Sequence, residues 1–345
     1  MTKRKLSRRE FLKQTSVLGI GGLLIPRFTP LMASTSQILA TSNVVVVTNS
    51  NATSGSTINQ TVVQSMTDYG IRTLTGISNL GLAWQSFFPG LTASSVIAIK
   101  VNCINGALST HPQVVNALTS GLTQMVSGTF PANNIIIYDR TDGELTGAGY
   151  TINTGTSGVR CFGTNHSGVG YDTSFTIPVG TQTRNITKIL TQYANYLING
   201  AVLKDHSSGG VTLSLKNHYG TINNPGSLAH GSPPTGCTPD VADISNSTTI
   251  KTKTKLIIID ALFGKHTWGP GGSPNITFNG LIFSTDTVAI DCVGRDILNT
   301  YRSTAVDANY IHTAASYGLG TDTNINRVNI NMVPAELSRW ETSIE

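Results

Sequence analysis

The chain has 345 residues, of which 39% are hydrophobic and only 12% are charged, and its formal net charge at pH 7 is +5. Residues 1–33 hold seven Lys or Arg and one acid, a net of +6, so the rest of the chain carries a net charge of −1. A nearly neutral body gives no electrostatic basis for binding nucleic acid or an anionic lipid surface.

The first 40 residues have the pattern of a twin-arginine (Tat) export signal. Arg8 and Arg9 precede Phe11 and Leu12, and the apolar run Val17–Ile25 follows. This run is too short to span a bilayer, which takes about 20 apolar residues. We expect cleavage within residues 33–40, the Tat translocation machinery as a partner, and a periplasmic or extracellular location without a stable membrane span. An uncleaved N-terminal anchor is the alternative.

Residues 41–345 alternate strand-like and helix-like segments. Strands are predicted at Val44–Val47, Val96–Val101, Ile135–Tyr138, Val211–Leu215 and Leu256–Ile259, and helices at Asn59–Tyr69, Pro112–Val126, Ile186–Leu197, Thr287–Tyr301 and Asn309–Tyr317. Several strand runs are continuously apolar, as in strands buried on both faces. The pattern predicts one α/β domain with a mixed, mostly parallel sheet flanked by helices. Irregular insertions are expected near 141–180 and 221–248, where they could cover a site.

Polar residues follow the second predicted strand. Lys100 and Asn102 come at its end, and Thr110, His111 and Pro112 open the next helix, with Thr110 as the expected N-cap. Ligands of open α/β sheets bind at the carboxyl ends of strands. We therefore expect Lys100, Asn102 and His111 to bind a ligand, and a capped helix start with an exposed histidine is the alternative.

The segment 201–220 is the strongest candidate for chemistry. A short apolar strand leads to Lys204 and His206, a glycine bend follows, and a second predicted strand ends in Lys216 and Asn217. Such a set suits a carboxylate or phosphate ligand, and its imidazoles suit a metal ion. Ordinary solvated charges at loop edges are the alternative.

A third polar segment follows the strand Leu256–Ile259. Asp260 ends that strand and suits a metal ligand or general base. Gly269 and Gly272 lie in a loop whose backbone can approach a ligand closely. Asp286 is expected to cap the helix that begins at Thr287. The sequence lacks the motifs of dinucleotide enzymes, P-loop nucleotide hydrolases, zincins and serine hydrolases.

The chain has four cysteines, which can form two disulfides in three pairings or remain buried thiols. They are Cys103, Cys161, Cys237 and Cys292. None forms a Cys-x-x-Cys pair, so the sequence offers no motif for an iron–sulfur cluster or a cysteine-ligated zinc ion.

Taken in order, these segments resemble the family called domain of unknown function 362. The matching pieces are Ile99–Asn102 with Thr110–Pro112, Leu203–His206 with Val211, Thr212 and Leu215–Asn217, Gly220, Ile259–Ala261, Gly269, Pro270 and Gly272, Ser284–Asp291, and Ala314–Gly320. The likeness spans roughly residues 44–331. Some relatives carry ferredoxin-type cysteine motifs, which this chain lacks, so the resemblance implies no iron–sulfur cofactor here.

Together the segments predict one polar site that binds a metal ion or a small anionic ligand, for a redox-linked or hydrolytic step. The candidate catalytic residues are Lys204, His206, Lys216 and Asp260. The candidate ligand-binding residues are Lys100, Asn102, His111, Asn217, Gly269 and Gly272. His206 and Asp260 are the candidate metal ligands. The alternatives are a non-catalytic ligand-binding or accessory protein of an exported redox system, and a structural surface protein.

Overall fold

The computed structural model describes residues 41–228 and 230–332, so the predicted export signal lies outside the described residues. The strands are β1 Ser42–Thr48, β2 Thr53–Ser54, β3 Thr57–Ile58, β4 Ile97–Lys100, β5 Ile135–Tyr138, β6 Arg160–Cys161, β7 Tyr171–Val179, β8 Gln182–Thr187, β9 Tyr196–His206, β10 Gly210–Val211, β11 Thr254–Lys265, β12 Ile276–Ser284 and β13 Ile325–Asn331. The α-helices are α2 Gln60–Thr75, α3 Leu80–Gln85, α4 Pro112–Leu122, α5 Met125–Gly128, α6 Asp142–Gly147, α7 Leu213–Asn217, α8 Asp240–Asn246, α9 Thr248–Lys253, α10 Thr287–Asn299 and α11 Asn309–Ser316. Single turns of other helix types are η1 Ala132–Asn134, η2 Ile189–Tyr193, η3 His218–Thr221 and η4 Pro225–Ser227.

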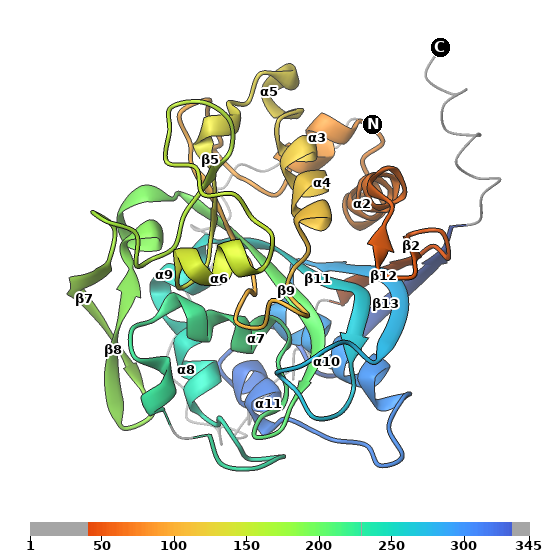
Figure 1. Ribbon diagram of the computed structural model, residues 1–345, viewed down its shortest axis with the longest axis vertical. Coiled ribbons are helices and arrows are strands. Elements are labelled where there is room, and N and C mark those ends of the chain that lie inside the picture. The colour runs from red at the N-terminus through yellow and green to blue at the C-terminus, as the bar shows by residue number, and fades with distance from the viewer. Residues whose placement is uncertain (1–40, 229, 333–345) are drawn as a thin grey trace, which may run out of the picture. The chain divides into compact units, whose positions relative to one another are not determined.

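The central sheet is mixed and mostly parallel, as the sequence predicts. Its strand order is β13-β1-β12-β11-β9-β4-β5-β6, and β10 pairs with β9 (Figure 1). Only β12 runs against its two neighbours on this path; β9, β4, β5 and β6 pair in parallel. The carboxyl ends of β4, β5 and β9 therefore meet at one edge of the sheet.

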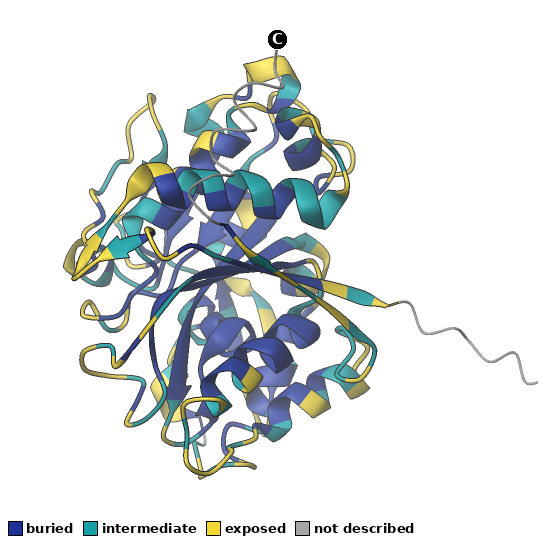
Figure 2. Cartoon of the chain, turned by 90° about the vertical axis from the view of Figure 1, so that its right-hand side faces the viewer, coloured by how far each residue is buried: buried dark blue, intermediate teal, exposed yellow. Residues whose placement is uncertain are grey.

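Helices cover both faces of this sheet because its strands are apolar on both sides. On one face, Val45, Ile99 and Ile258 share a core with residues of α2 and α4. On the other face, Val46 and Ile259 share a core with residues of α7, α8, α10 and α11. Figure 2 shows the buried strands between the two helical layers. A third core beside β7 and β8 contains Ala98 and Ile136. This two-sided burial explains the continuous apolar runs of the sequence.

Two predicted elements are wrong. Val211–Leu215 is expected to be a strand, but the chain turns at Leu213, with φ of 41°, and forms α7. Ile186–Leu197 is expected to be a helix, but it holds the end of β8, the short turn η2 and the start of β9. Local apolar spacing does not separate short helices from strands when both are buried.

The two segments predicted to be irregular contain regular structure. Residues 141–180 hold α6, β6 and β7, and β7 pairs with β8 in a separate two-stranded sheet. Residues 221–248 hold η4 and α8. The strands β12 and β13 were not predicted at all. Both strands have partly exposed side chains, and Gly280 and several Asn interrupt their apolar residues. The apolar pattern that indicates a strand is therefore weak in both.

All four cysteines are free and buried, so none of the three possible disulfide pairings is formed. Within residues 41–228 and 230–332, no helix is both long enough and apolar enough to cross a membrane.

Candidate functional site

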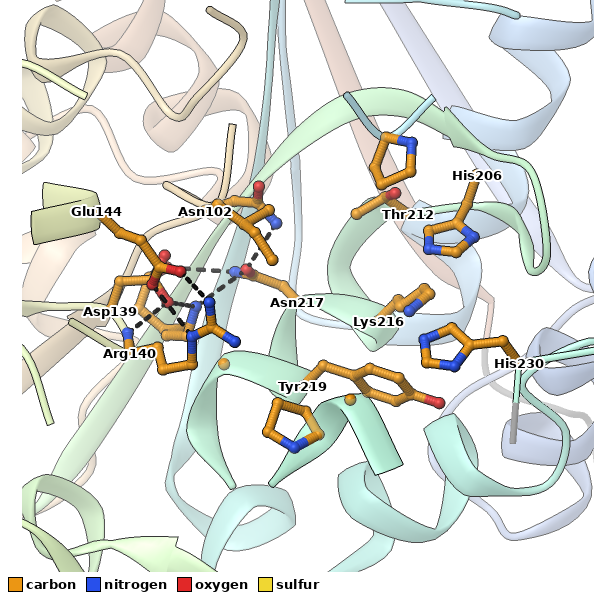
Figure 3. A pocket seen from close by; sticks show the side chains of 16 residues that line it. Asn102, Asp139, Arg140, Glu144, His206, Thr212, Lys216, Asn217, Tyr219 and His230 are labelled. Carbon is orange, nitrogen blue, oxygen red and sulfur yellow. Dashed lines mark hydrogen bonds and ion pairs between the residues drawn. The ribbon is translucent and has the colours of Figure 1, made fainter. Parts of the chain in front are cut away.

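A cavity of about 160 Å³ lies at the carboxyl edge of the sheet, against η3 and the loops after β5 and β9. It is smaller than most pockets for drug-sized ligands, which span about 300–1,000 Å³, so it suits a ligand of few atoms. The cavity is lined by Lys100, Asn102, Ile104, Asp139, Arg140, Glu144, His206, Thr212, Lys216, Asn217, Tyr219, Gly220, Pro225, Gly226, His230 and Pro270 (Figure 3).

A buried ion pair forms one wall of the cavity. Lys100 Nζ, at the end of β4, lies 2.7 Å from Asp139 Oδ1, at the end of β5, and both side chains are at most 5% exposed. Asp139 also accepts hydrogen bonds from the backbone N–H groups of Cys103 (2.6 Å) and Arg140 (2.7 Å). A Cβ on Gly220 would lie 2.6 Å from Asp139 Oδ1, so glycine is needed where η3 covers this pair.

Asparagines connect this wall to α7. Asn217 Oδ1 accepts hydrogen bonds from Lys100 Nζ (3.2 Å) and Asn102 Nδ2 (3.1 Å), and Asn217 Nδ2 donates to Asn199 Oδ1 (2.8 Å). Asn102 Oδ1 in turn accepts from Lys204 Nζ at 2.7 Å. Buried polar groups cost free energy unless they are paired, and here each amide finds a partner. The network therefore fixes α7 relative to β4 and β9.

The helix α7 begins where the sequence predicts a strand because α10 supplies a cap. The carboxylate of Asp291 accepts hydrogen bonds from the N–H groups of Ser214 (2.8 Å) and Leu215 (3.0 Å). These groups have no acceptor within a helix that starts at Leu213, and a carboxylate there favours helix formation. Burial raises the pKa of Asp291 to about 7. The cap places Lys216 and Asn217 at the cavity.

Lys216 is a buried cation without a counter-ion among the residues that the structure describes. Its side chain is 6% exposed, and its ammonium group makes no hydrogen bond or ion pair with any residue that the structure describes. Its ammonium group lies over the ring of Tyr219, whose centroid is 3.7 Å from Nζ. Burial lowers the pKa of Lys216 to about 8. An unpaired buried ammonium group is costly, which makes this residue the clearest mark of a binding site.

Two histidines flank Lys216 with opposite hydrogen-bonding character. His206 Nδ1 accepts from the N–H groups of Ser208 and Gly209, both at 3.1 Å, and burial lowers the pKa of His206 to about 3. Its ring is therefore neutral at pH 7 with the proton on Nε2. His230 Nδ1 lies 2.9 Å from the carbonyl oxygen of Leu228 and must donate to it. In neutral His230, Nε2 is then an acceptor.

Arg140 provides a third positive group at the cavity. Its guanidinium group forms an ion pair with Glu144, four residues later on α6. The two acids of the lining are thus both occupied, Asp139 by Lys100 and Glu144 by Arg140. Among the described lining residues, the charge without an opposite partner is that of Lys216.

Lys204 does not reach the cavity. It is fully buried and donates to Asn102 Oδ1 and to the carbonyl oxygen of Leu108 (3.1 Å). Burial lowers the pKa of Lys204 to about 8. This lysine, expected from its position to be catalytic, holds Asn102 in place from behind.

Asp260 and His111 form a separate pair. Asp260 lies inside β11, which continues to Lys265 instead of ending at Asp260, and its side chain is inaccessible to solvent. Asp260 Oδ2 lies 2.7 Å from His111 Nδ1 and accepts from His111 N at 2.8 Å. Burial lowers the pKa of His111, but the charge and hydrogen bond of Asp260 outweigh it, so the pKa is raised. His111, and not Thr110, is the N-cap of α4.

The pair of metal ligands expected from the sequence is separated in the fold. Val202 faces Asp260 in the register of β9 and β11, and His206 lies four residues further along β9, about 13 Å at roughly 3.3 Å per residue. No group of three or more His, Cys, Asp or Glu side chains suited to a metal ion occurs in residues 41–228 and 230–332. The predicted single site thus splits into the cavity, the Lys204 support and the His111–Asp260 pair.

The predicted glycine loop closes over the cavity through its backbone. Asn105 Nδ2 donates to the carbonyl oxygens of Pro270 (3.2 Å) and Gly272 (2.8 Å), and Pro270 lines the cavity. A Cβ on Gly269 would lie 2.2 Å from Asp205 Oδ1, so this position requires glycine. Neither Gly269 nor Gly272 lines the cavity itself.

Several lining residues were not predicted from the sequence as site residues. Asp139 follows the apolar strand β5, and the strand-end argument made for Asp260 applies to it with less force, so it is not among the candidate site residues. Glu144 lies within the segment 141–180 that is expected to be irregular, Arg140 lies just before it, and no local pattern marks either residue. Tyr219 and His230 reach the cavity only because η3 and the chain after η4 fold back across the sheet edge.

Comparison with known proteins supports one assignment. No curated protein matches the chain. A crystal structure of a Thermotoga maritima protein from a structural genomics consortium aligns with 10% sequence identity and a TM-score of 0.34, over 76% of this chain and 60% of that protein. The family model "Domain of unknown function (DUF362)" matches residues 97–296, which include every candidate site residue named above. The chain belongs to the DUF362 family.

Proposed function

We propose that this protein is exported and binds a small oxyanion, a carboxylate or a phosphate, in the cavity around Lys216. The proposal rests on one observation above all: Lys216 is a buried lysine that lines the cavity and has no anionic partner in the described part of the chain. A bound anion would supply the negative charge that Lys216 lacks as a partner. Its hydrogen bond with the ammonium group would be charge-assisted, and such bonds are stronger than those between neutral groups.

The other lining groups suit the same ligand. His206 offers the N–H of its Nε2, since its Nδ1 already accepts two hydrogen bonds. Arg140 keeps N–H groups that Glu144 does not use. The lining acids are neutralised by Lys100 and Arg140, so they do not repel an anion. Donors thus converge on a space of about 160 Å³.

Export through the twin-arginine route belongs to this proposal and is supported by the paired Arg8 and Arg9 with the apolar run after them. The ligand would then be one that occurs in the periplasm or outside the cell. The anion site is compatible with catalysis and with simple binding as an accessory protein.

Calorimetric titration of the exported protein with inorganic phosphate and with pyruvate tests the proposal. Lys216→Met is expected to weaken binding roughly 10- to 100-fold, because one charge-assisted hydrogen bond contributes about 1.5–3 kcal/mol. Lys251→Met, which removes an exposed lysine of α9, is the matched control and should bind as the wild type does. The proposal would be refuted if the wild type bound neither anion, or if Lys216→Met bound them with the same affinity as the wild type.

A further inference from the structure

Three lysines are buried beside the same sheet edge, and their surroundings differ in one respect. Lys100 has Asp139, the carbonyl oxygen of Val101 and Asn217 as partners. Lys204 has Asn102 and the carbonyl oxygen of Leu108. Lys216 has only the face of the Tyr219 ring among the residues described, and it lines the cavity. The nitrogen of Lys216 is therefore the one whose lone pair, once deprotonated, is free and open to a ligand.

We propose that Lys216 forms an imine with the carbonyl carbon of a small 2-oxo carboxylate bound in the cavity. This inference rests on the proposed anion site and names its substrate class. A carboxylate next to a carbonyl group would be drawn to the ammonium group and would place its electrophilic carbon beside Nζ. A lysine desolvated in a closed pocket is the usual nucleophile for carbonyl substrates.

The two histidines supply the proton transfer and the hydrogen bond that this reaction needs. Figure 3 shows the head of Lys216 between the rings of His206 and His230. The Nε2 lone pair of His230 can take a proton from the ammonium group and later return it to the departing oxygen, while the Nε2–H of His206 can donate a hydrogen bond to the carbonyl oxygen. The remaining ionisable neighbours of Lys216 are Tyr219, which is half-buried, and Cys237, which is buried.

The step balances without an oxidant, a reductant or a second substrate. The lone pair of Nζ forms a bond to the carbonyl carbon, and one of the two N–H protons moves from nitrogen to the oxygen to give a neutral carbinolamine. The C–O bond then breaks: the oxygen takes the proton that His230 removed from the ammonium group and leaves as water, and the nitrogen lone pair completes a C=N double bond. The product is a protonated imine, which keeps a positive charge at Nζ, next to the ligand carboxylate. The same lysine can thus attract the anion and bind it covalently.

Burial also makes the amine more available. With a pKa of about 8, Lys216 has about 200 times the neutral fraction of an ordinary lysine at pH 7.5. Lys204 has a similar pKa, but its ammonium group donates hydrogen bonds to Asn102 Oδ1 and to the carbonyl oxygen of Leu108. Lys204 also does not line the cavity. Comparison of these two lysines separates an effect of cavity geometry from an effect of pKa alone.

Reductive trapping with pyruvate and cyanoborohydride, followed by peptide mass spectrometry, tests the proposal. The full-length exported protein is expected to carry the reduced pyruvate adduct at Lys216, with Lys100 and Lys204 unmodified and the exposed Lys251 modified at least tenfold more slowly. Inorganic phosphate should suppress the adduct at Lys216 but not at Lys251. This measurement uses the wild type, so it does not depend on the folding of a variant.

Lys216→Arg separates the two proposals because it keeps the cation and removes the amine. It is expected to retain phosphate binding in the calorimeter and to lose the cavity adduct. If the wild type binds pyruvate but its adducts are spread over surface lysines as in the unfolded chain, the imine is refuted and the anion site stands. If the wild type binds neither anion and gives no selective adduct, both proposals are refuted.

Discussion

The ion pair between Lys100 and Asp139 allows a quantitative test of how the cavity wall is stabilised. Asp139→Asn preserves the shape of the side chain but removes the charge opposite Lys100. Breaking a buried pair from one side costs about 3–5 kcal/mol, because the remaining charge is uncompensated. Lys100 would keep the carbonyl oxygen of Val101 (2.5 Å) and Asn217 Oδ1 (3.2 Å), so we expect the lower end, about 3 kcal/mol.

Urea unfolding followed by circular dichroism and fluorescence measures this cost. For an m-value near 3 kcal/mol/M, the midpoint should fall by about 1 M. Asp296→Asn is the control: its carboxylate is 57% exposed and lies 3.0 Å from Arg295, and a surface pair contributes about 0–1 kcal/mol. The double variant Lys100→Met with Asp139→Asn should recover part of the loss. A cost for Asp139→Asn no larger than that of Asp296→Asn, or strict additivity in the double variant, would refute this reasoning.

Two further predictions concern pH. His111→Asn should destabilise the fold by about 1.5–3 kcal/mol at pH 5.5 and by less at pH 9. Because the pKa of His111 is raised in the folded protein, its protonated ring stabilises the fold fully below about pH 6.5, and this stabilisation is lost as the pH rises through the pKa of the folded state. Phosphate affinity should be unchanged, since the His111–Asp260 pair does not line the cavity; a matching loss of affinity would contradict the separation of the two. Asp291 has a folded pKa of about 7 against about 3.9 in the unfolded chain, so the wild type should lose up to about 4 kcal/mol relative to Asp291→Asn between pH 4 and pH 7. Melting temperatures of both proteins at pH 4.5 and pH 8 check this, and a constant difference would count against it.

The strands and helices were predictable from the sequence where a local pattern of residues determines them. Ile135–Tyr138 and the β-branched part of β11 are continuous apolar runs, and such runs indicate strands buried on both faces. Thr287 was predicted to begin a helix behind Asp286, and the structure confirms this cap, with Asp286 Oδ1 accepting from the N–H groups of Val288 and Ala289. In each case the signal and the cause lie within a few residues of one another.

The site was less predictable because its causes lie far apart in the chain. The sequence Leu213–Asn217 reads as a strand, and it becomes a helix because Asp291, more than 70 residues later, caps it. Asp260 reads as the end of a strand, and β11 continues past it to pair with β12 as far as Gly264. Strand ends gave the correct edge of the sheet, but not which polar groups at that edge face outward to the cavity and which support it.

Charge compensation, and not position, separates the lysines at this edge. All three lysines at this edge, Lys100, Lys204 and Lys216, are buried. The hydrogen bonds of the first two connect β4, β9 and α7. A fold that needed Lys216 only for stability would be expected to pair it as well, since an unpaired buried cation lowers stability and an apolar side chain of similar length would not. The cost of leaving Lys216 unpaired is instead offset when an anion binds, because ligand binding to the native state stabilises it by mass action. Lys216→Met should therefore melt at a higher temperature than the wild type in ligand-free buffer and lose that advantage in saturating phosphate, whereas a lower melting temperature in ligand-free buffer would show that Lys216 is structural.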